Sequence, residues 1–246
     1  MSAGRPVARL RVATVNVREL LDDGRALRRV LEAAAADVVC VQEAPVHPLA
    51  AHRLGDLAAA AGLWVTAAGR PGAGTAVLTA ARVDVRAADV LRLPTPRWRH
   101  RRPVRARGAA EVVVRVPLGA GWSLPVRVTS VHLGLDAAER EAQADVLLAR
   151  GGERPRVPAV LAGDLNEGPD GPVRTRLATV LADAAQVAGA TAATFPARAP
   201  RSRLDVVLAD RRLGVATAGT ADVPTAVAAA ATDHLAVVAD LLVPGA

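Results

Sequence analysis

Polar side chains that can bind a cation or move a proton recur at the ends of short, valine-rich segments that we predict to be strands. Six such segments each place an acid, an amide or an imidazole at or near one end. In an α/β scaffold the ends of strands open onto a cleft, so we expect these groups to meet there. The residues are Asn16, Glu43, His132, Asp164, Asn166, Asp205, Asp233 and His234.

Taken singly, most of these residues have an ordinary structural explanation. Glu43 alone fits a loop acid or a helix cap, and His132 alone fits a hydrogen-bonded core histidine. Asp164 and Asn166 alone fit a turn in which their side chains bond nearby backbone amides. Asp205 is harder to explain in this way, because an acid inside an apolar strand is costly to bury without a partner. The chain has only two asparagines, and both belong to this set.

The order and content of the six segments resemble the endonuclease/exonuclease/phosphatase superfamily, metal-dependent phosphoesterases that include deoxyribonucleases and abasic-site nucleases. The resemblance extends over about residues 10–242. The matching segments are Thr14-Val15-Asn16, Gln42-Glu43, Ser130-Val131-His132-Leu133, Gly163-Asp164-Leu165-Asn166, Arg203-Leu204-Asp205 and Thr232-Asp233-His234. The departures are Val15 where the family has Trp, Leu165 where it has Phe and Thr232 where it has Ser. None of them removes a ligand.

The resemblance implies an α/β fold, a four-layer sandwich with two mixed β-sheets face to face and helices on the outside. The active cleft would lie at one edge of the sandwich. By resemblance, Glu43 is the main metal ligand, with Asn16 beside it and Asp233 nearby. Such carboxylate and amide oxygens favour a hard cation, Mg²⁺ or Mn²⁺, over zinc.

The resemblance also implies catalytic roles. Asp164 and Asn166 would orient the nucleophilic water and contact the phosphate or a second ion. His234, held by Asp205, would be the general base or an imidazole that stabilises the transition state. His132 would act from the other side, on the leaving oxygen or a phosphate oxygen.

A basic segment between Arg92 and Arg107 carries the formal charge excess of +7. It holds seven of the 31 arginines and no acid, whereas the remaining 24 arginines balance 24 acids. The family often has a Tyr or Arg before the Thr-His-Leu pattern. Because the chain has no tyrosine, Arg107 is the nearest match, and we expect Arg105 and Arg107 to bind substrate phosphate. Most of the other arginines fit a solvated loop, and Trp98 fits either base stacking or packing on the surface.

Composition excludes several classes of protein. The single cysteine, Cys40, cannot form an internal disulfide, which excludes a disulfide-framed secreted scaffold and a zinc finger. No apolar run approaches the roughly 18 residues that a membrane helix needs, and no signal peptide is evident, so we expect a cytoplasmic protein without membrane contact. The absence of lysine and isoleucine indicates a GC-rich coding bias, so the high pI is weak evidence about partners.

The hydropathy pattern predicts one domain over residues 1–246, in which strands alternate with helices. The first predicted helix covers 26–34, with Asp22 or Asp23 as its cap, and the second begins at Pro48. Asp136 with Glu139 caps a third helix, which ends near Arg150. A fourth helix starts at Asp170 and Pro172. Short connections between the strands from 63 to 131 suggest antiparallel pairing. The predicted strands are 9–15, 37–42, 63–67, 74–79, 82–91, 110–116, 126–131, 157–162, 203–208, 213–219 and 235–242.

The motifs define the reaction better than the substrate. We expect a nuclease acting on DNA or RNA, because phosphate contacts dominate nucleic-acid affinity and the arginine-rich segment should flank the cleft. The alternative is a phosphomonoesterase or small-molecule phosphodiesterase that acts on an inositol, nucleotide or lipid head group. A non-catalytic binding module would have lost a metal or imidazole ligand, and this chain has lost none. We expect a monomer.

Overall fold

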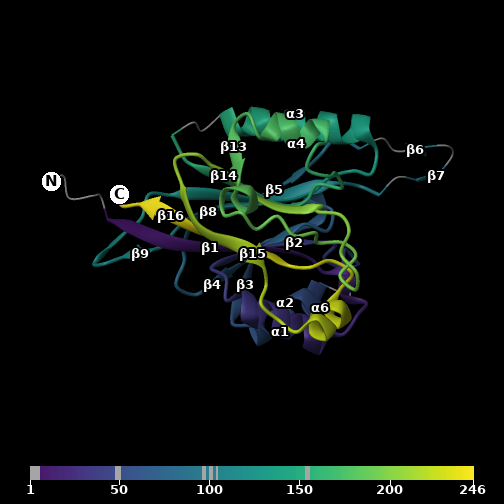
Figure 1. Cartoon of the computed structure of the whole chain (residues 1–246), viewed down its shortest axis with the longest axis horizontal. Helices are drawn as coiled ribbons and strands as arrows, with labels where there is room; N and C mark the ends of the chain where they lie inside the picture. Colours follow the sequence, from purple (N-terminus) through teal and green to yellow (C-terminus); the bar gives the residue numbers. More distant parts are fainter. Residues whose placement is uncertain (1–5, 48–50, 96–97, 100–101, 104, 153–155) are drawn as a thin grey trace.

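Two six-stranded sheets lie face to face in the computed structural model, which describes residues 6–47, 51–95, 98–99, 102–103, 105–152 and 156–246. Helices cover the outer face of each sheet (Figure 1). The predicted sandwich of two mixed sheets between helices is therefore confirmed. None of the helices in the described ranges is long and apolar enough to cross a membrane.

The first sheet has the strand order β15-β16-β1-β2-β4-β3. β1 and β2 are parallel, and the other neighbours are antiparallel. Consequently β1 and β2 end at the same edge. The strands are β1 (Val7–Asn16), β2 (Val38–Gln42), β3 (Leu63–Ala67), β4 (Ala76–Ala80), β15 (Gly214–Thr220) and β16 (Val237–Pro244).

The second sheet has the strand order β13-β14-β12-β11-β8-β5. Here β11 and β12 are the parallel pair, so they too end together, and β14 begins at the same edge because it runs antiparallel to β12. The strands are β5 (Asp84–Arg92), β8 (Gly108–Arg115), β11 (Val126–His132), β12 (Ala159–Asp164), β13 (Leu181–Asp183) and β14 (Asp205–Asp210).

The helices lie on the two outer faces (Figure 1). On the first sheet these are α1 (Gly24–Ala34), α2 (Ala51–Ala60) and α6 (Thr225–Ala231), and on the second α3 (Ala137–Gly152) and α4 (Pro172–Leu177). Asp23, one of the two predicted caps, begins α1 by accepting hydrogen bonds from the backbone amides of Arg25 and Ala26. Asp136 accepts from the amide of Glu139 at the start of α3.

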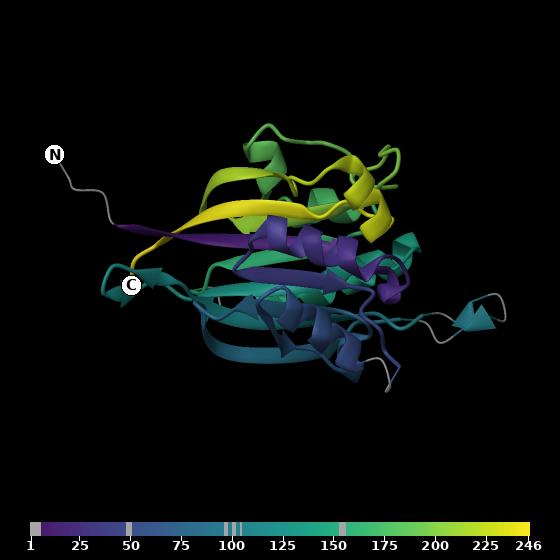
Figure 2. The same cartoon turned by 90° about the horizontal axis from the view of Figure 1, so that it is seen from below.

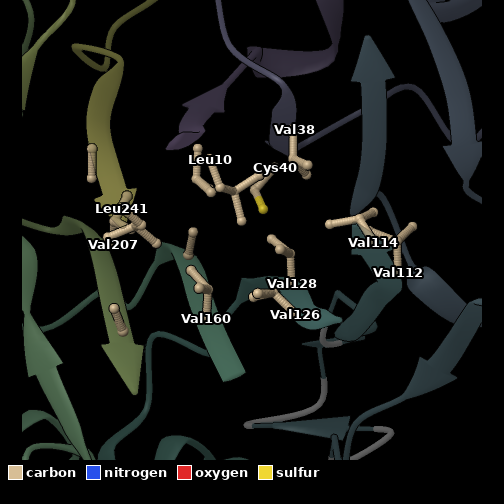
Figure 3. Close-up of a cluster of buried hydrophobic side chains, with 14 of the residues drawn as sticks. Leu10, Val38, Cys40, Val112, Val114, Val126, Val128, Val160, Val207 and Leu241 are labelled. Atoms are coloured by element: carbon tan, nitrogen blue, oxygen red, sulfur yellow. The ribbon is translucent and has the colours of Figure 1, made fainter. Parts of the chain in front are cut away.

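The main core fills the space between the sheets and consists mostly of valine and alanine. Figure 3 shows side chains from both sheets pointing toward one another, with Cys40 among them. Burial raises the pKa of the Cys40 thiol, so it is an inert core residue. Two further apolar clusters lie beneath the helices on the outer faces. Valine suits these strands because its branched side chain fits a pleated surface that is buried on both faces.

Several expectations about elements differ from the structure. The strands β4 and β5 are not paired, because the chain passes from one sheet to the other between Ala80 and Asp84. Asp170 does not cap α4, whose N-cap is Gly171, and Glu167 instead accepts from the amide of Arg174. The short elements β13, α5 (Ala184–Val187) and α6 were not predicted. The predicted start at Pro48 lies outside the described residues, within which α2 begins at Ala51.

Two small hairpins project from the sandwich, and one belongs to the arginine-rich segment. β6 (Trp98–Arg99) pairs with β7 (Arg102–Pro103), and the hairpin extends beyond the sheets at one end of the molecule (Figures 1 and 2). The other, β9 (Pro117–Leu118) with β10 (Gly121–Trp122), lies beside the C-terminus, where the amide of Ala246 donates to the carbonyl of Trp122 (Figure 2). Parts of the arginine-rich segment between these elements are outside the described residues.

Candidate active site

The parallel strand pairs of the two sheets bring the predicted site residues to one edge. Asn16 ends β1, and Glu43 follows β2 beside it. His132 and Asp164 end β11 and β12 in direct register, and Asp205, at the start of β14, is the other neighbour of Asp164. The site therefore spans both sheets.

A buried amide side chain joins the sheets just behind this edge. Gln42 accepts a hydrogen bond from the hydroxyl of Thr14 at 3.0 Å and donates to that of Ser130, in the other sheet, at 3.1 Å. This cross-link fixes the ends of β2 and β11 relative to each other.

Asp164 lies at the centre of the site and is 2% exposed. Its Oδ1 accepts from the backbone amide of Asn166 at 2.8 Å, and its Oδ2 lies 3.4 Å from the amide nitrogen of Asn16. The Nε2 atoms of His132 and His234 lie 3.5 Å and 3.8 Å from Oδ2. Burial, reinforced by the negative charge of Asp205, raises the pKa of Asp164 to about 6.

Asp205 and His234 form a buried hydrogen-bonded pair, with Nδ1 of the imidazole 2.9 Å from Oδ2 of the carboxylate. Because Asp205 engages Nδ1, Nε2 is the nitrogen that faces Asp164. Burial disfavours the charged imidazole, but the hydrogen bond and charge of Asp205, together with Asp164 and Asp233, outweigh it and raise the pKa of His234 to about 9. Oδ1 of Asp205 has no hydrogen-bond partner within the described part of the chain.

His132 has the opposite electrostatic environment. Burial and the positive charges of Arg107, His234 and Arg105 hold its pKa well below the usual value, so the imidazole is neutral. The side-chain nitrogen of Asn166 lies 3.0 Å from Nε2 of His132 and also donates to the carbonyl of Leu133 at 2.9 Å. Asn166 thus fixes the orientation of His132.

Asn16 and Glu43 lie together at the more open side of the site. The amide nitrogen of Asn16 lies 3.3 Å from Oε1 of Glu43, and its Oδ1 accepts from the backbone amide of Arg18 at 3.1 Å. Glu43 has a φ of 51° and Asn166 one of 49°, in the left-handed region that non-glycine residues seldom adopt. Such strain is common at functional sites.

Asp233 is 39% exposed and lies at the rim. Its carboxylate lies 3.6 Å from Nε of Arg18 and accepts from the hydroxyl of Thr232 at 3.4 Å. That hydroxyl also donates to the carbonyl of Asn16 at 2.7 Å. Asp233 therefore neighbours Asn16 through Thr232, whereas Asp164 contacts Asn16 directly.

The donors fit a hard divalent cation. Glu43, Asp164 and Asp233 supply carboxylate oxygens, which Mg²⁺ and Mn²⁺ prefer. Asn16 directs its side-chain nitrogen at Glu43 and Asp164 and its Oδ1 at the amide of Arg18, so its oxygen would reach an ion once the side-chain amide rotated. A second group, Asp164, Asp205 and His234, has ligand atoms within 4.8 Å of one another among the described residues. Asp164 belongs to both groups. Among the described residues, ligand atoms of acids and histidines are gathered this closely in the second group, where the hydrogen bond between Asp205 and His234 already occupies part of the donor set.

The two predicted phosphate-binding arginines both lie at the site. Arg107 is buried, and burial lowers its pKa while Glu139, Asp164 and Glu43 favour its charge. Arg105 is more exposed and pairs with Glu19 and with Glu43, its Nη1 lying 3.6 Å from Oε2 of Glu43. The side chain of Trp98 is outside the described part of the chain.

A model of the Endonuclease/Exonuclease/phosphatase family matches residues 13–234, which include every predicted site residue. The chain belongs to this family. Its members hydrolyse phosphoester bonds and generally depend on a divalent metal, and the chain is accordingly a phosphoester hydrolase, as predicted. No curated protein matches the sequence.

Solved structures of the family share the fold. An endonuclease/exonuclease/phosphatase from Beutenbergia cavernae DSM 12333 is 27% identical, with a TM-score of 0.73 over 97% of this chain and 72% of that one. The mannosyl-6-phosphatase Bt3783 of Bacteroides thetaiotaomicron VPI-5482 is 19% identical, with a TM-score of 0.75 over 94% and 99%. D. rerio TDP2, complexed with single-strand DNA product, is 17% identical, with a TM-score of 0.72 over 95% and 99%. The last two similarities show the fold alone.

Several residues of this family site were not singled out from the sequence. Arg18 pairs with Asp233, and Thr194 and Phe195 contact the Asp205–His234 pair. Thr194 and Phe195 lie in a loop and Arg18 in a three-residue 3-10 helix, and in neither does hydropathy show a period. A signal was present for Phe195, because it is the chain's only phenylalanine.

Proposed function

We propose that this hydrolase is a divalent-metal-dependent phosphodiesterase that cleaves DNA or RNA. The observation that carries the proposal is the position of Asp164, whose Oδ2 lies within 3.8 Å of Asn16 and of both imidazoles. A phosphate bound in front of Asp164 would meet acidic, amide and imidazole groups from both sheets. The buried Cys40 suits the reducing cytoplasm, where we place the protein as a single-domain monomer.

Glu43 and Asn16, with Asp233 nearby, would hold Mg²⁺ or Mn²⁺. When bound there, the ion would neutralise charge that develops on the phosphoryl oxygens. In this structure the guanidinium group of Arg105 pairs with Glu43. With the ion bound to Glu43, that group would be released to contact the substrate.

The catalytic roles follow from which atoms face the centre. Asp164 and Asn166 would orient the attacking water, because Asp164 directs Oδ2 into the site and Asn166 is anchored to it through its backbone. His234 would direct Nε2 at a phosphoryl oxygen while Asp205 holds Nδ1. The neutral His132, on the other side of Asp164, would contact the leaving oxygen.

Nucleic acid is favoured as the substrate by the arginine-rich segment. Arg105 and Arg107 place the carboxyl-terminal end of that segment in the site, and the β6–β7 hairpin projects from the sandwich (Figure 2). Arginine binds phosphate through two parallel hydrogen bonds, so the segment could hold a polyanion along several phosphates.

The reaction is tested with purified protein and Mg²⁺ or Mn²⁺ against plasmid, single strands, RNA and a bis-aryl phosphodiester. We expect nucleic acid to be cut and chelation to abolish the reaction. Hydrolysis of small esters with no cleavage of any nucleic acid would contradict the nuclease assignment.

The role of the segment is tested by replacing Arg99, Arg101 and Arg102 with glutamine. Each lost phosphate contact removes about 0.9 from the slope of log K against log salt, so the slope should flatten by up to about 3. The matched control replaces three exposed arginines at the opposite end of the sandwich, Arg86, Arg156 and Arg211, and should leave the slope unchanged. Arg107→Gln should instead lower turnover with little change in slope. An unaltered affinity of the triple variant at low salt would show that the segment is a solvated loop.

A phosphomonoesterase or small-molecule phosphodiesterase is the second candidate. It is favoured by the shared fold of the mannosyl-6-phosphatase, a phosphosugar enzyme by its name. Its substrate could equally be an inositol, nucleotide or lipid head group. A rate that is high on a phosphosugar or another small ester and insensitive to salt would select this function.

A further inference from the structure

We infer that Thr194 and Phe195 are positioning residues for the Asp205–His234 pair, Thr194 by fixing the backbone of Asp205 and Phe195 by fixing the plane of the imidazole. The inference rests on the proposed function of that pair. Neither residue lies on a helix or strand, and within the described ranges no hydrogen bond or ring contact joins either of them to the proposed metal ligands Asn16, Glu43 and Asp233.

Thr194 is a buried hydrogen-bonding hub, 1% exposed. Its hydroxyl oxygen accepts from the backbone amides of Leu204 at 3.1 Å and Asp205 at 3.2 Å. Its own carbonyl accepts from the amide of Leu235, the residue after His234, at 2.8 Å. One side chain and one peptide group thus connect the backbones on both sides of the Asp205–His234 pair.

This hub matters because the backbone of Asp205 is held on one side by the pairing of β14 with β12, while its carboxylate has few restraints of its own. Oδ2 bonds to His234, but Oδ1 has no hydrogen-bond partner within the described ranges. The direction of the carboxylate therefore depends on its backbone, which Thr194 holds. Replacing the hydroxyl by a methyl group would leave the buried amide of Asp205 and the partly buried amide of Leu204 without this acceptor.

Phe195 restrains the other member of the pair. The centroid of its ring lies 4.7 Å from that of the His234 imidazole, at an angle of 42°. The backbone of Phe195 is itself anchored, because it exchanges hydrogen bonds with Ser202, each of 2.9 Å. The bond from Nδ1 to Asp205 leaves the imidazole free to tilt about that bond, and the Phe195 ring limits this motion.

The loop that carries both residues is also tied to the next motif. The amide of Ala197 donates to the carbonyl of Asp233 at 2.7 Å. The loop therefore holds β14 and the Asp233–His234 segment together. Loss of this alignment would move Nε2 of His234 away from its position 3.8 Å from Asp164 without altering the arginines that bind the substrate.

The test compares isosteric and conservative variants. Thr194→Val keeps the shape and removes the acceptor, and Thr194→Ser keeps the acceptor. Phe195→Leu removes the aromatic ring, and Phe195→Tyr keeps it. Thr79→Val is the control, because it removes another buried hydroxyl, bonded to Thr66 in the first sheet.

We expect Thr194→Val to lower kcat on the bis-aryl phosphodiester about 10-fold or more, since small displacements of catalytic groups cost this much, with KM changed less than about 2-fold. Phe195→Leu should lower kcat about 3- to 10-fold. Thr194→Ser and Phe195→Tyr should restore most of the rate, and Thr79→Val should retain it. Wild-type kcat in Thr194→Val, or an equal loss of kcat in Thr194→Ser, would overturn the inference for Thr194. Wild-type kcat in Phe195→Leu, or an equal loss of kcat in Phe195→Tyr, would overturn it for Phe195.

A second readout needs no turnover. With ¹⁵N-labelled histidine and chelator present, the Nδ1 proton of His234 should give a downfield signal that Asp205→Asn removes. Thr194→Val and Phe195→Leu should broaden or shift this signal, and Thr79→Val should not. If His234→Ala kept the wild-type rate, the proposed catalytic role of His234 would be wrong. The signal of the Nδ1 proton in the Thr194 and Phe195 variants would still show whether those residues position the imidazole. An unchanged signal in both loop variants would contradict the positioning itself.

Discussion

Strand β1 connects two clusters of charge that are built in opposite ways. At its start, the buried carboxylate of Asp240 accepts hydrogen bonds from Arg9, Arg11 and Thr217. At its end, Asn16 meets Asp164, whose carboxylate is buried beside a second acid. Burial works against ionisation of Asp240, but its hydrogen bonds prevail and lower its pKa to about 2, whereas the pKa of Asp164 is raised to about 6.

The difference shows what each end is for. The Asp240 cluster satisfies its carboxylate within the chain and can only stabilise the fold. Among the described residues the site offers Oδ1 of Asp205 no hydrogen-bond partner, and it places Glu43 and Asn166 in strained backbone conformations. Such an arrangement costs stability unless a ligand makes use of it. We therefore expect substitutions at the two ends to separate activity from stability.

The largest effect should come from Asp164→Asn. The amide keeps the shape but removes the charge at the centre of the site, so kcat should fall by about 100-fold or more. In the presence of chelator, urea unfolding should give an equal or higher free energy of unfolding, because a buried charge beside Asp205 has been removed. An Asp164→Asn variant that is both active and less stable would contradict the proposed difference between the active site and the Asp240 cluster.

The next effect concerns Asp205 and His234 as one unit. Each alanine variant alone should lower kcat nearly as much as the double variant, because the carboxylate acts through the imidazole that it orients. The measurement is a double-mutant cycle in kcat on the bis-aryl phosphodiester. Simple additivity of the two losses would show that the pair does not act together.

At the other end of β1, Asp240→Asn should leave kcat unchanged and lower the free energy of unfolding by about 2–3 kcal/mol, since Arg9 and Arg11 lose a shared buried partner. The partly exposed arginines keep this below the cost for a fully buried pair. Glu32→Gln, which breaks the exposed pair with Arg28, is the control and should cost under about 0.5 kcal/mol. An equal cost for both variants would show that burial of Asp240 adds nothing.

The smallest effect is the pH dependence of the difference in free energy of unfolding between wild type and Asp240→Asn. The pKa of Asp240 is lower in the folded chain than its unfolded value of about 3.9, so its contribution to stability is complete above about pH 5. The contribution should shrink as the pH falls through the folded pKa of about 2 and disappear near pH 1, where the carboxylate is protonated in both states. Urea midpoints of wild type and Asp240→Asn should therefore converge between about pH 5 and pH 1. A constant gap over this range would refute the assigned cause.

The sequence predicts the active-site residues better than it predicts the Asp240 cluster at the other end of β1. Asn16 and His132 end apolar strands and Glu43 directly follows one, so the recurrence of this pattern along the chain marks them for the cleft edge. Asp240 and its arginines follow no such pattern, because their pairing depends on the alignment of β1 with β16, more than 200 residues apart. The crossing between sheets at Ala80 was likewise missed, since a short connection looks the same whether the strands pair or separate.

The loops were the least predictable part of the site. Arg18, Glu19 and Leu20 form a turn with three consecutive positive φ angles, and the sequence has no glycine there to signal it. Thr194 and Phe195 reach the site through side-chain contacts from a loop. Such contacts depend on tertiary structure rather than on local propensity.

The metal dependence of phosphodiester hydrolysis tests the central claim most directly. Chelator-treated protein is titrated with Mg²⁺ and with Mn²⁺ while the initial rate on plasmid and on a bis-aryl phosphodiester is followed, beside Glu43→Ala. We predict that the wild-type rate rises from background to saturation, and that Glu43→Ala needs at least about 10-fold more metal and reaches a lower rate. A wild-type rate that survives chelation, or a Glu43→Ala variant with unchanged rate and metal dependence, would contradict the account.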